Sequence, residues 1–227
     1  MQSENIRRNN VSAREQVPSN NLVQIYQKGT ENLKVLFVGN SITYHAPKQE
    51  IGWEGSWGMA ASCSSNDYVH QAVTLLKERY GEVAYAIAQL AQWELQFYEE
   101  RTEWKDSYEL AHMFQADVVV IRMGENIPTS VLNSKDTKTH IENMIAFFSN
   151  KSEAVVVTDS FWKRPKLDNL LKEICEEKGY IYCKISDLEA DKKTMALGLF
   201  SHEGVSIHPS DYGMQQIAKR IVAVLDV

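Results

Sequence analysis

Five apolar runs alternate along the chain with segments of helical periodicity. The first run, residues 33–38, is apolar except for Lys34 and ends at Gly39. Continuous apolar runs of this length are typical of strands buried on both faces of a parallel sheet. The remaining runs lie at residues 83–90, 116–124, 154–160 and 180–186.

The segments between these runs predict helices at residues 67–80, 136–148, 165–178 and 209–225, with a short helical piece at 189–197. Residues 93–114 alternate acidic and aromatic side chains and predict one or two amphipathic helices that cover the sheet. Strands alternating with helices predict a three-layer α/β/α fold with a five-stranded parallel sheet. For this sheet we expect the flavodoxin-like strand order 2-1-3-4-5.

The chain divides into a polar N-terminal arm or extension, residues 1–30, and one α/β domain, residues 31–227. Within the extension, residues 22–26 suit either a short edge strand or a packed segment. A long stretch without helical period, residues 44–65, carries three glycines and two tryptophans. Loops of this length in compact domains are usually functional, so we expect it to be ordered.

Composition narrows the possible partners. A chain of 227 residues with 44% hydrophobic content can bury one sizeable core. The formal charge of -6 and the pI near 5.6 predict no binding of nucleic acid or of a membrane surface, because those partners need clustered Lys and Arg. The three cysteines, Cys63, Cys175 and Cys183, show no CxxC spacing, so we expect neither a disulfide framework nor a metal site, and no cofactor.

The first twenty residues lack the apolar core of a secretory signal, and no later run approaches the length of a membrane span. As written, the sequence predicts a soluble, cytoplasmic protein. A signal peptide outside the given sequence would change this expectation.

Three polar residues are candidates for chemistry. Ser41 follows the first strand in Gly-Asn-Ser, and Asn126 follows the third strand after Gly124. In the expected strand order these two strands are neighbours, so the hydroxyl and the amide face each other across the crevice where ligands bind. Ser41 could equally be a turn former or helix cap. A serine nucleophile needs a nearby base, and His208, before the closing helix, is the main candidate, with His202 as its competitor.

These residues carry a resemblance to the SGNH (GDSL-type) hydrolases. GNSIT resembles the first block of that family, MGENI the third block, and IHPSDYGM the last block, in the family's order over residues 34–222. Between them, GWEGSWGMAAS is similar to a glycine-bearing loop found in a bacterial branch of the family. The resemblance implies a hydrolase domain and a carboxylic ester hydrolase activity.

Carried over residue by residue, the resemblance makes Ser41 the nucleophile and His208 the general base. It implies an oxyanion hole formed by the backbone N–H of Ser41, the Asn126 amide and a backbone N–H of the loop glycine, for which we take Gly58 ahead of Gly55. The reaction would pass through an acyl-enzyme on Ser41.

One position departs from the family pattern. The family places Asp three residues before the histidine, and here that residue is Val205. Glu203 is the candidate third catalytic residue, and a backbone carbonyl near it would serve the same purpose. Asp211 ranks below both, because a carboxylate at a helix start usually caps backbone N–H groups.

The resemblance implies a small-molecule or carbohydrate ester as the partner, with short acyl groups such as acetyl. The candidate substrate-binding residues are Trp53, Trp57 and Glu125. The two tryptophans are chosen because indole rings offer apolar faces with one donor. The alternatives are a thioesterase or lysophospholipase acting on longer acyl chains, and a non-catalytic carbohydrate-binding module on the same fold. Nothing in the sequence predicts the oligomeric state.

Overall fold

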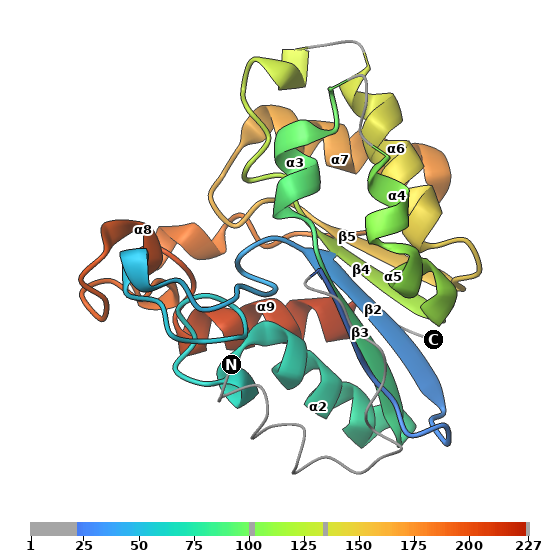
Figure 1. Ribbon diagram of the computed structural model, residues 1–227, viewed down its shortest axis with the longest axis horizontal. Coiled ribbons are helices and arrows are strands. Elements are labelled where there is room, and N and C mark those ends of the chain that lie inside the picture. The colour runs from blue at the N-terminus through green and yellow to red at the C-terminus, as the bar shows by residue number, and fades with distance from the viewer. Residues whose placement is uncertain (1–21, 100–102, 134–135, 226–227) are drawn as a thin grey trace.

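A computed structural model describes residues 22–99, 103–133 and 136–225. Its centre is a sheet of strand order β1-β3-β2-β4-β5-β6 (Figure 1). The strands are β1 (Val23–Tyr26), β2 (Leu33–Gly39), β3 (Val83–Gln89), β4 (Val118–Arg122), β5 (Ala154–Thr158) and β6 (Ile181–Cys183). Strands β2 to β6 are parallel, which confirms the order expected for the five apolar runs.

The strand count differs from the expected five, because β1 adds a sixth strand at the edge of the sheet. It pairs antiparallel with β3, with Val23 opposite Ala88 and Tyr26 opposite Tyr85. The Tyr26 and Tyr85 rings stack with their centroids 4.5 Å apart. The segment at residues 22–26 is therefore an edge strand. The polar arm stays a prediction for residues 1–21, which lie outside the described residues.

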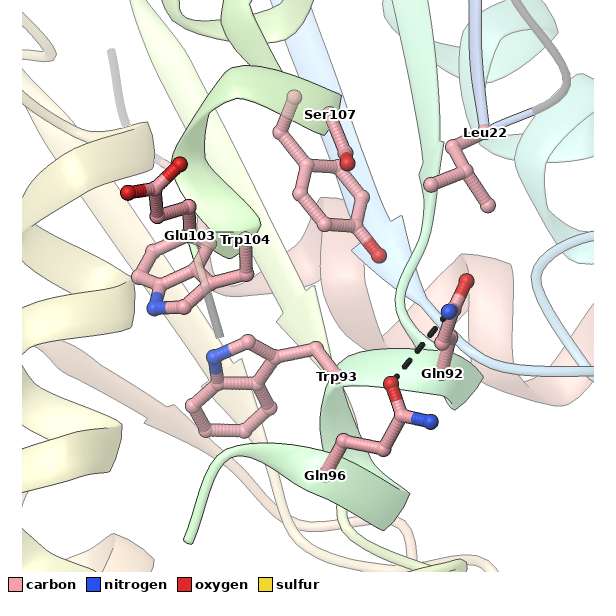
Figure 2. A pocket seen from close by; sticks show the side chains of 8 residues that line it. Leu22, Gln92, Trp93, Gln96, Glu103, Trp104 and Ser107 are labelled. Carbon is pink, nitrogen blue, oxygen red and sulfur yellow. Dashed lines mark hydrogen bonds between the residues drawn. The ribbon is translucent and has the colours of Figure 1, made fainter. Parts of the chain in front are cut away.

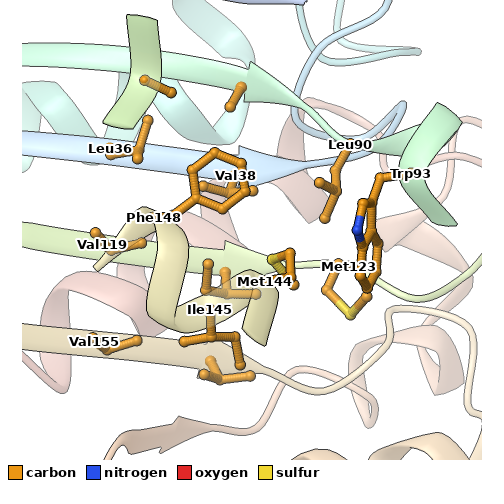
Figure 3. Close-up of a cluster of buried hydrophobic side chains, with 14 of the residues drawn as sticks. Leu36, Val38, Leu90, Trp93, Val119, Met123, Met144, Ile145, Phe148 and Val155 are labelled. Carbon is orange, nitrogen blue, oxygen red and sulfur yellow. The ribbon is translucent and has the colours of Figure 1, made fainter. Parts of the chain in front are cut away.

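Helices cover both faces of the sheet (Figure 1). On one face lie α2 (Tyr68–Tyr80) and α9 (Asp211–Ala223), whose apolar residues pack on the β2 side chains Val35 and Phe37. On the other face, α5 (Glu109–Phe114), α6 (Thr137–Phe148) and α7 (Pro165–Lys178) pack on Leu36 and Val38. Figure 3 shows this second core, in which α6 meets the alternate side chains of three strands.

The helix ends follow their local sequence. Asp67 caps α2 by accepting a hydrogen bond from the backbone N–H of His70, and Pro165 begins α7 while Gly179 ends it in the left-handed conformation. Two expectations are corrected. Residues 93–114 are not one or two helices, because α3 (Ala91–Gln96) and α4 (Trp104–Ser107) precede α5. The closing helix begins at Asp211, after its cap Ser210, rather than at Pro209.

The long segment between β2 and α2 is ordered, as expected. It contains the short 3-10 helices Gln49–Ile51 and Ser64–Asn66 and two isolated bridges, His45 to Trp57 and Lys48 to Trp53. Among the described residues, no helix is both long enough and apolar enough to cross a bilayer.

The packing of the strand ends can be tested by a substitution at Gly39, the last residue of β2. A Cβ atom there would collide with Oγ1 of Thr43 and with the carbonyl oxygen of Arg122. We expect Gly39→Ala to lower the free energy of unfolding by about 2 kcal/mol, measured by urea denaturation, because overpacking forces backbone shifts. The exposed control Lys172→Ala should stay within about 0.5 kcal/mol. Equal losses in the two variants would contradict tight packing.

Candidate active site

Ser41 lies in a tight turn directly after β2. The backbone N–H groups of Thr43 and Tyr44 both donate to the Asn40 carbonyl, at 2.9 and 3.0 Å. This turn reverses the chain at the carboxyl edge of the sheet and leaves Ser41 partly exposed.

His208 reaches this turn from the other end of the chain. It follows the short helix α8 (Glu203–Ser206), and its backbone N–H donates to the Val205 carbonyl at 3.0 Å. Its Nε2 lies 2.8 Å from the Ser41 Oγ, and its Nδ1 lies 2.6 Å from the Gly204 carbonyl oxygen. A carbonyl can only accept, so Nδ1 carries the proton of the neutral ring. Nε2 is then free to accept the Ser41 hydroxyl proton.

Burial keeps this imidazole neutral. His208 is 9% exposed, and desolvation lowers its pKa to about 4, with the Gly204 carbonyl opposing the shift and the Arg122 charge adding to it. The Trp162 ring stands edge-on to the imidazole, with centroids 4.9 Å apart. His208 is therefore a neutral hydrogen-bond acceptor across the physiological pH range.

The residue that orients His208 is not Glu203. The Glu203 side chain is exposed, and the Gly204 carbonyl holds Nδ1, so the main-chain alternative is the one that the structure shows. The competitor His202 is exposed as well. Asp211 accepts hydrogen bonds from the N–H and hydroxyl of Ser62, 2.8 and 2.6 Å away, and so ties the loop to α9.

Asn126 lies in the turn after β4. Gly124 has a φ of 111°, which favours glycine, and a Cβ atom there would also collide with Leu167. The Asn126 side-chain amide donates to Oε2 of Glu94 at 2.6 Å. One of its two amide protons is thus held by a buried carboxylate, which leaves the other for a ligand.

Gly58 has a different role from the one expected. Its N–H donates to Oδ2 of Asp67 at 3.2 Å, and a Cβ atom would crowd the Ile42 carbonyl. The next residue, Met59, donates its N–H to the Ser41 carbonyl at 2.8 Å. Ala60 then has a positive φ of 72°, uncommon for a residue with a side chain. Within the described residues, the N–H groups of Ser41 and Ala60 have no acceptor.

The three candidate substrate-binding residues are differently placed. Trp53 is 2% exposed and packs in a small core with Met59 and Val205, so it is a structural residue of the loop. Glu125 also turns inward, and its carboxylate pairs with Arg122 at 2.7 Å. The Trp57 ring is partly exposed, and its Nε1 donates to the Ala61 carbonyl at 2.8 Å.

A pocket of about 140 Å³ lies elsewhere, between α3 and α4 (Figure 2). The indole rings of Trp93 and Trp104 meet edge to face there, with centroids 6.1 Å apart. Its lining includes neither Ser41 nor His208. No cluster of three or more metal-ligating side chains occurs in the part of the chain that the structure describes.

The low pKa of His208 can be measured directly. We expect its ring resonances to titrate with a midpoint near pH 4 in NMR spectra, assigned by comparison with His208→Asn. Between pH 6.5 and pH 4 the unfolded chain binds a proton here that the folded chain does not, so His208 lowers the free energy of unfolding as the pH falls. A midpoint at 6.5 or above would contradict a desolvated ring.

No family model and no curated protein matches the sequence. Solved structures do match over most of the chain. A GDSL-like lipase of Parabacteroides merdae gives a TM-score of 0.54 at 17% identity, covering 86% of this chain and 95% of its own. The family 3 carbohydrate esterase of Clostridium thermocellum gives 0.55 at 16%, covering 84% and 94%.

A two-domain esterase active on acetylated mannans gives a TM-score of 0.56 at 16% identity, and the match covers 86% of this chain but 49% of that one. The TM-scores establish a shared fold, and at identities this low they establish the fold alone. In this chain Ser41 follows the first parallel strand of the sheet, and His208 precedes the last helix. The chain has the fold of the SGNH (GDSL-type) hydrolases.

Proposed function

We propose that this protein is a serine esterase that removes short acyl groups, most simply acetyl, from carbohydrate hydroxyls through an acyl-enzyme on Ser41. The observation that carries the proposal is the 2.8 Å contact between the Ser41 Oγ and Nε2 of a buried, neutral His208. A hydroxyl that donates to a fixed imidazole is the activated nucleophile of acyl transfer.

The chemistry follows from this pair. The Ser41 Oγ attacks the ester carbonyl carbon while Nε2 of His208 takes the hydroxyl proton. The tetrahedral intermediate collapses, the alcohol leaves with the proton from Nε2, and the acyl group stays on Oγ. Water then attacks the acyl carbon while Nε2 takes a proton from it. The bond from the acyl carbon to Oγ breaks, Oγ recovers the proton from Nε2, and the acid is released. The Gly204 carbonyl keeps Nδ1 protonated and the ring aligned in both halves.

Three donors are proposed for the oxyanion. They are the free amide proton of Asn126 and the backbone N–H groups of Ser41 and Ala60. Ala60 replaces Gly58 in this role, because Gly58 already donates to Asp67. The Met59 N–H bond to the Ser41 carbonyl supports the choice, because it ties the residue before Ala60 to the nucleophile. Each such donor typically contributes about 3 kcal/mol to lowering the barrier.

The substrate class is supported by comparison and by the surface. Two of the matched proteins are by name a carbohydrate esterase and an esterase active on acetylated mannans. Partly exposed tryptophans such as Trp57 and Trp162 suit a sugar face, and Trp162 contacts His208 directly. We place the alcohol of the ester against these two rings.

One observation favours a second candidate, an esterase for longer acyl chains. Leu197, Leu199 and Ile207 are exposed by 44, 73 and 37%, and Ile207 directly precedes His208. Apolar side chains at this position would suit an acyl tail. Nitrophenyl esters from acetate to octanoate separate the two candidates: a kcat/KM that falls with chain length supports the short-acyl proposal, and one that rises supports the alternative.

The nucleophile can be tested without knowing the substrate. A fluorophosphonate probe should label the wild-type protein, and Ser41→Ala should lose labelling and reduce acetate ester hydrolysis by about a thousandfold or more. Ser130 is an exposed serine, so Ser130→Ala is the matched control. This variant should leave probe labelling and ester hydrolysis unchanged. Labelling that survives in Ser41→Ala would show that the reactive nucleophile is another residue. A wild type that the probe never modifies would favour a non-catalytic binding module.

Glu203 gives the complementary test. Because the Gly204 carbonyl orients the imidazole, we expect Glu203→Gln to change kcat by less than about threefold, whereas His208→Ala should lower it by about a thousandfold. The kcat values of both variants can be measured from ester hydrolysis at pH 7.5 and at further fixed pH values. Losses of similar size in the two variants would show that Glu203 acts on the imidazole after all.

A further inference from the structure

Two buried carboxylates lie beneath the proposed oxyanion amide. Glu94, on α3, has no exposed surface, and the side chain of Glu125, after β4, is 6% exposed. Arg122 pairs with Glu125, but among the described residues no cation pairs with Glu94. An unpaired buried carboxylate is costly unless its oxygens are fully hydrogen-bonded.

The Glu94 oxygens meet that condition entirely through N–H donors. Oε1 accepts from the backbone N–H of Gly124 at 2.6 Å and from the Asn40 amide at 3.1 Å. Oε2 accepts from the side-chain amide and backbone N–H of Asn126, at 2.6 and 3.2 Å. Only the ionised carboxylate accepts at all four positions, because a protonated carboxyl presents one O–H in place of an acceptor.

The same group is linked to the nucleophile turn. The Asn40 amide, adjacent to Ser41, also donates to Oε2 of Glu125 at 2.6 Å, and its Oδ1 accepts from the Arg122 guanidinium. From the opposite side, Arg164 donates to the carbonyl oxygens of Gly124 and Ile127. The turn that carries Asn126 is therefore held by its N–H groups on one side and by its carbonyls on the other.

We propose that ionised Glu94 is a positioning residue for the reaction: it fixes the Asn126 amide so that the remaining N–H points at the oxyanion, and protonation of Glu94 releases that amide. The inference rests on the proposed esterase function. Glu94 does not contact the substrate, and its effect passes through Asn126.

Protonation of Glu94 is accessible near neutral pH. Desolvation, followed by the charge of Glu125, raises the pKa of Glu94 to about 7, against the Gly124 and Asn126 hydrogen bonds and the Arg122 charge. Burial also opposes ionisation of Glu125, but Arg122 and Asn40 outweigh it and lower the Glu125 pKa. The other facing titratable group, Tyr108, stays neutral, because burial raises its pKa. The required form of Glu94 is thus gained as the pH rises through about 7.

The first measurement uses the wild-type protein. The second-order rate of fluorophosphonate labelling should rise with pH with a midpoint near 7, above the midpoint near 4 that His208 alone would give. In Glu94→Gln the rise in labelling rate with a midpoint near pH 7 should be absent, and only a rise with a midpoint near pH 4 should remain. A wild-type midpoint near 4 overturns the inference even if the variant does not fold.

The second measurement is a double-mutant cycle with Asn126→Ala. We expect Glu94→Gln to lower the labelling rate and kcat by about 10- to 100-fold, less than complete removal of one donor would, with KM for nitrophenyl acetate within about threefold. In the Asn126→Ala background the same change should have no further effect beyond about twofold. Independent, multiplying losses would show that Glu94 acts on general stability rather than on the amide.

The controls separate structure from positioning. Glu94→Asp keeps the charge and should retain the limb near pH 7 while recovering part of the rate. The exposed Glu109→Gln should match the wild type in rate, pH profile and thermal midpoint. A wild type that the probe does not label at Ser41 ends the esterase proposal and this inference with it. If the probe labels Ser41 but the losses in Glu94→Gln and Asn126→Ala multiply independently, the inference about Glu94 fails and the esterase proposal stands.

Discussion

The parallel pairing of β2 with β4 is the constraint on which the site depends. It sets Gly39 opposite Arg122, so the turns that follow the two strands emerge side by side at one edge of the sheet. Asn40 and Glu125 then meet through a 2.6 Å hydrogen bond, although 85 residues separate them. A slip of this register by one residue would turn the side chains to opposite faces and break the contact. The strand pairing thus determines whether a hydroxyl and an amide can serve a single ligand.

Hydrophobic patterning predicted most of this arrangement because it reports burial. The five apolar runs became the five parallel strands in the expected order. Asp67 and Pro165 stand at helix starts and Gly179 ends a helix, as these residue types predict. Patterning was weaker where burial is partial. Residues 22–26 left two interpretations open. The described part of residues 93–114 contains three short helices, since aromatic and acidic residues alternate there without a clean period.

The sequence pointed to Ser41 and His208 as candidates, but not to the groups that hold the site in place. Ser41 and His208 could be found because they follow recognisable strand and helix boundaries. Glu94 could not, because a glutamate on an amphipathic segment gives no sign that it turns inward to meet Asn126. The residue types along a sequence also do not show which main-chain atoms form hydrogen bonds. The contact of the Gly204 carbonyl with His208, and the Ala60 N–H proposed as an oxyanion donor, are therefore seen only in the structure. The positive φ of Ala60 is likewise a feature of the backbone that its residue type does not predict.

The carbonyl of Gly204 makes the proposed catalytic pair, Ser41 and His208, tolerant of side-chain substitution. An orienting carboxylate can be deleted by one codon change, whereas a peptide oxygen persists whatever side chain occupies the position, so drift in α8 leaves the ring in register. The exchange has a chemical cost. A neutral dipole stabilises an imidazolium less than a full negative charge would, so in the proposed reaction the proton taken by Nε2 is held weakly and returned readily to the departing alcohol. In the proposed reaction this chain would then suit esters whose alcohol leaves only as it gains a proton, as a carbohydrate hydroxyl does.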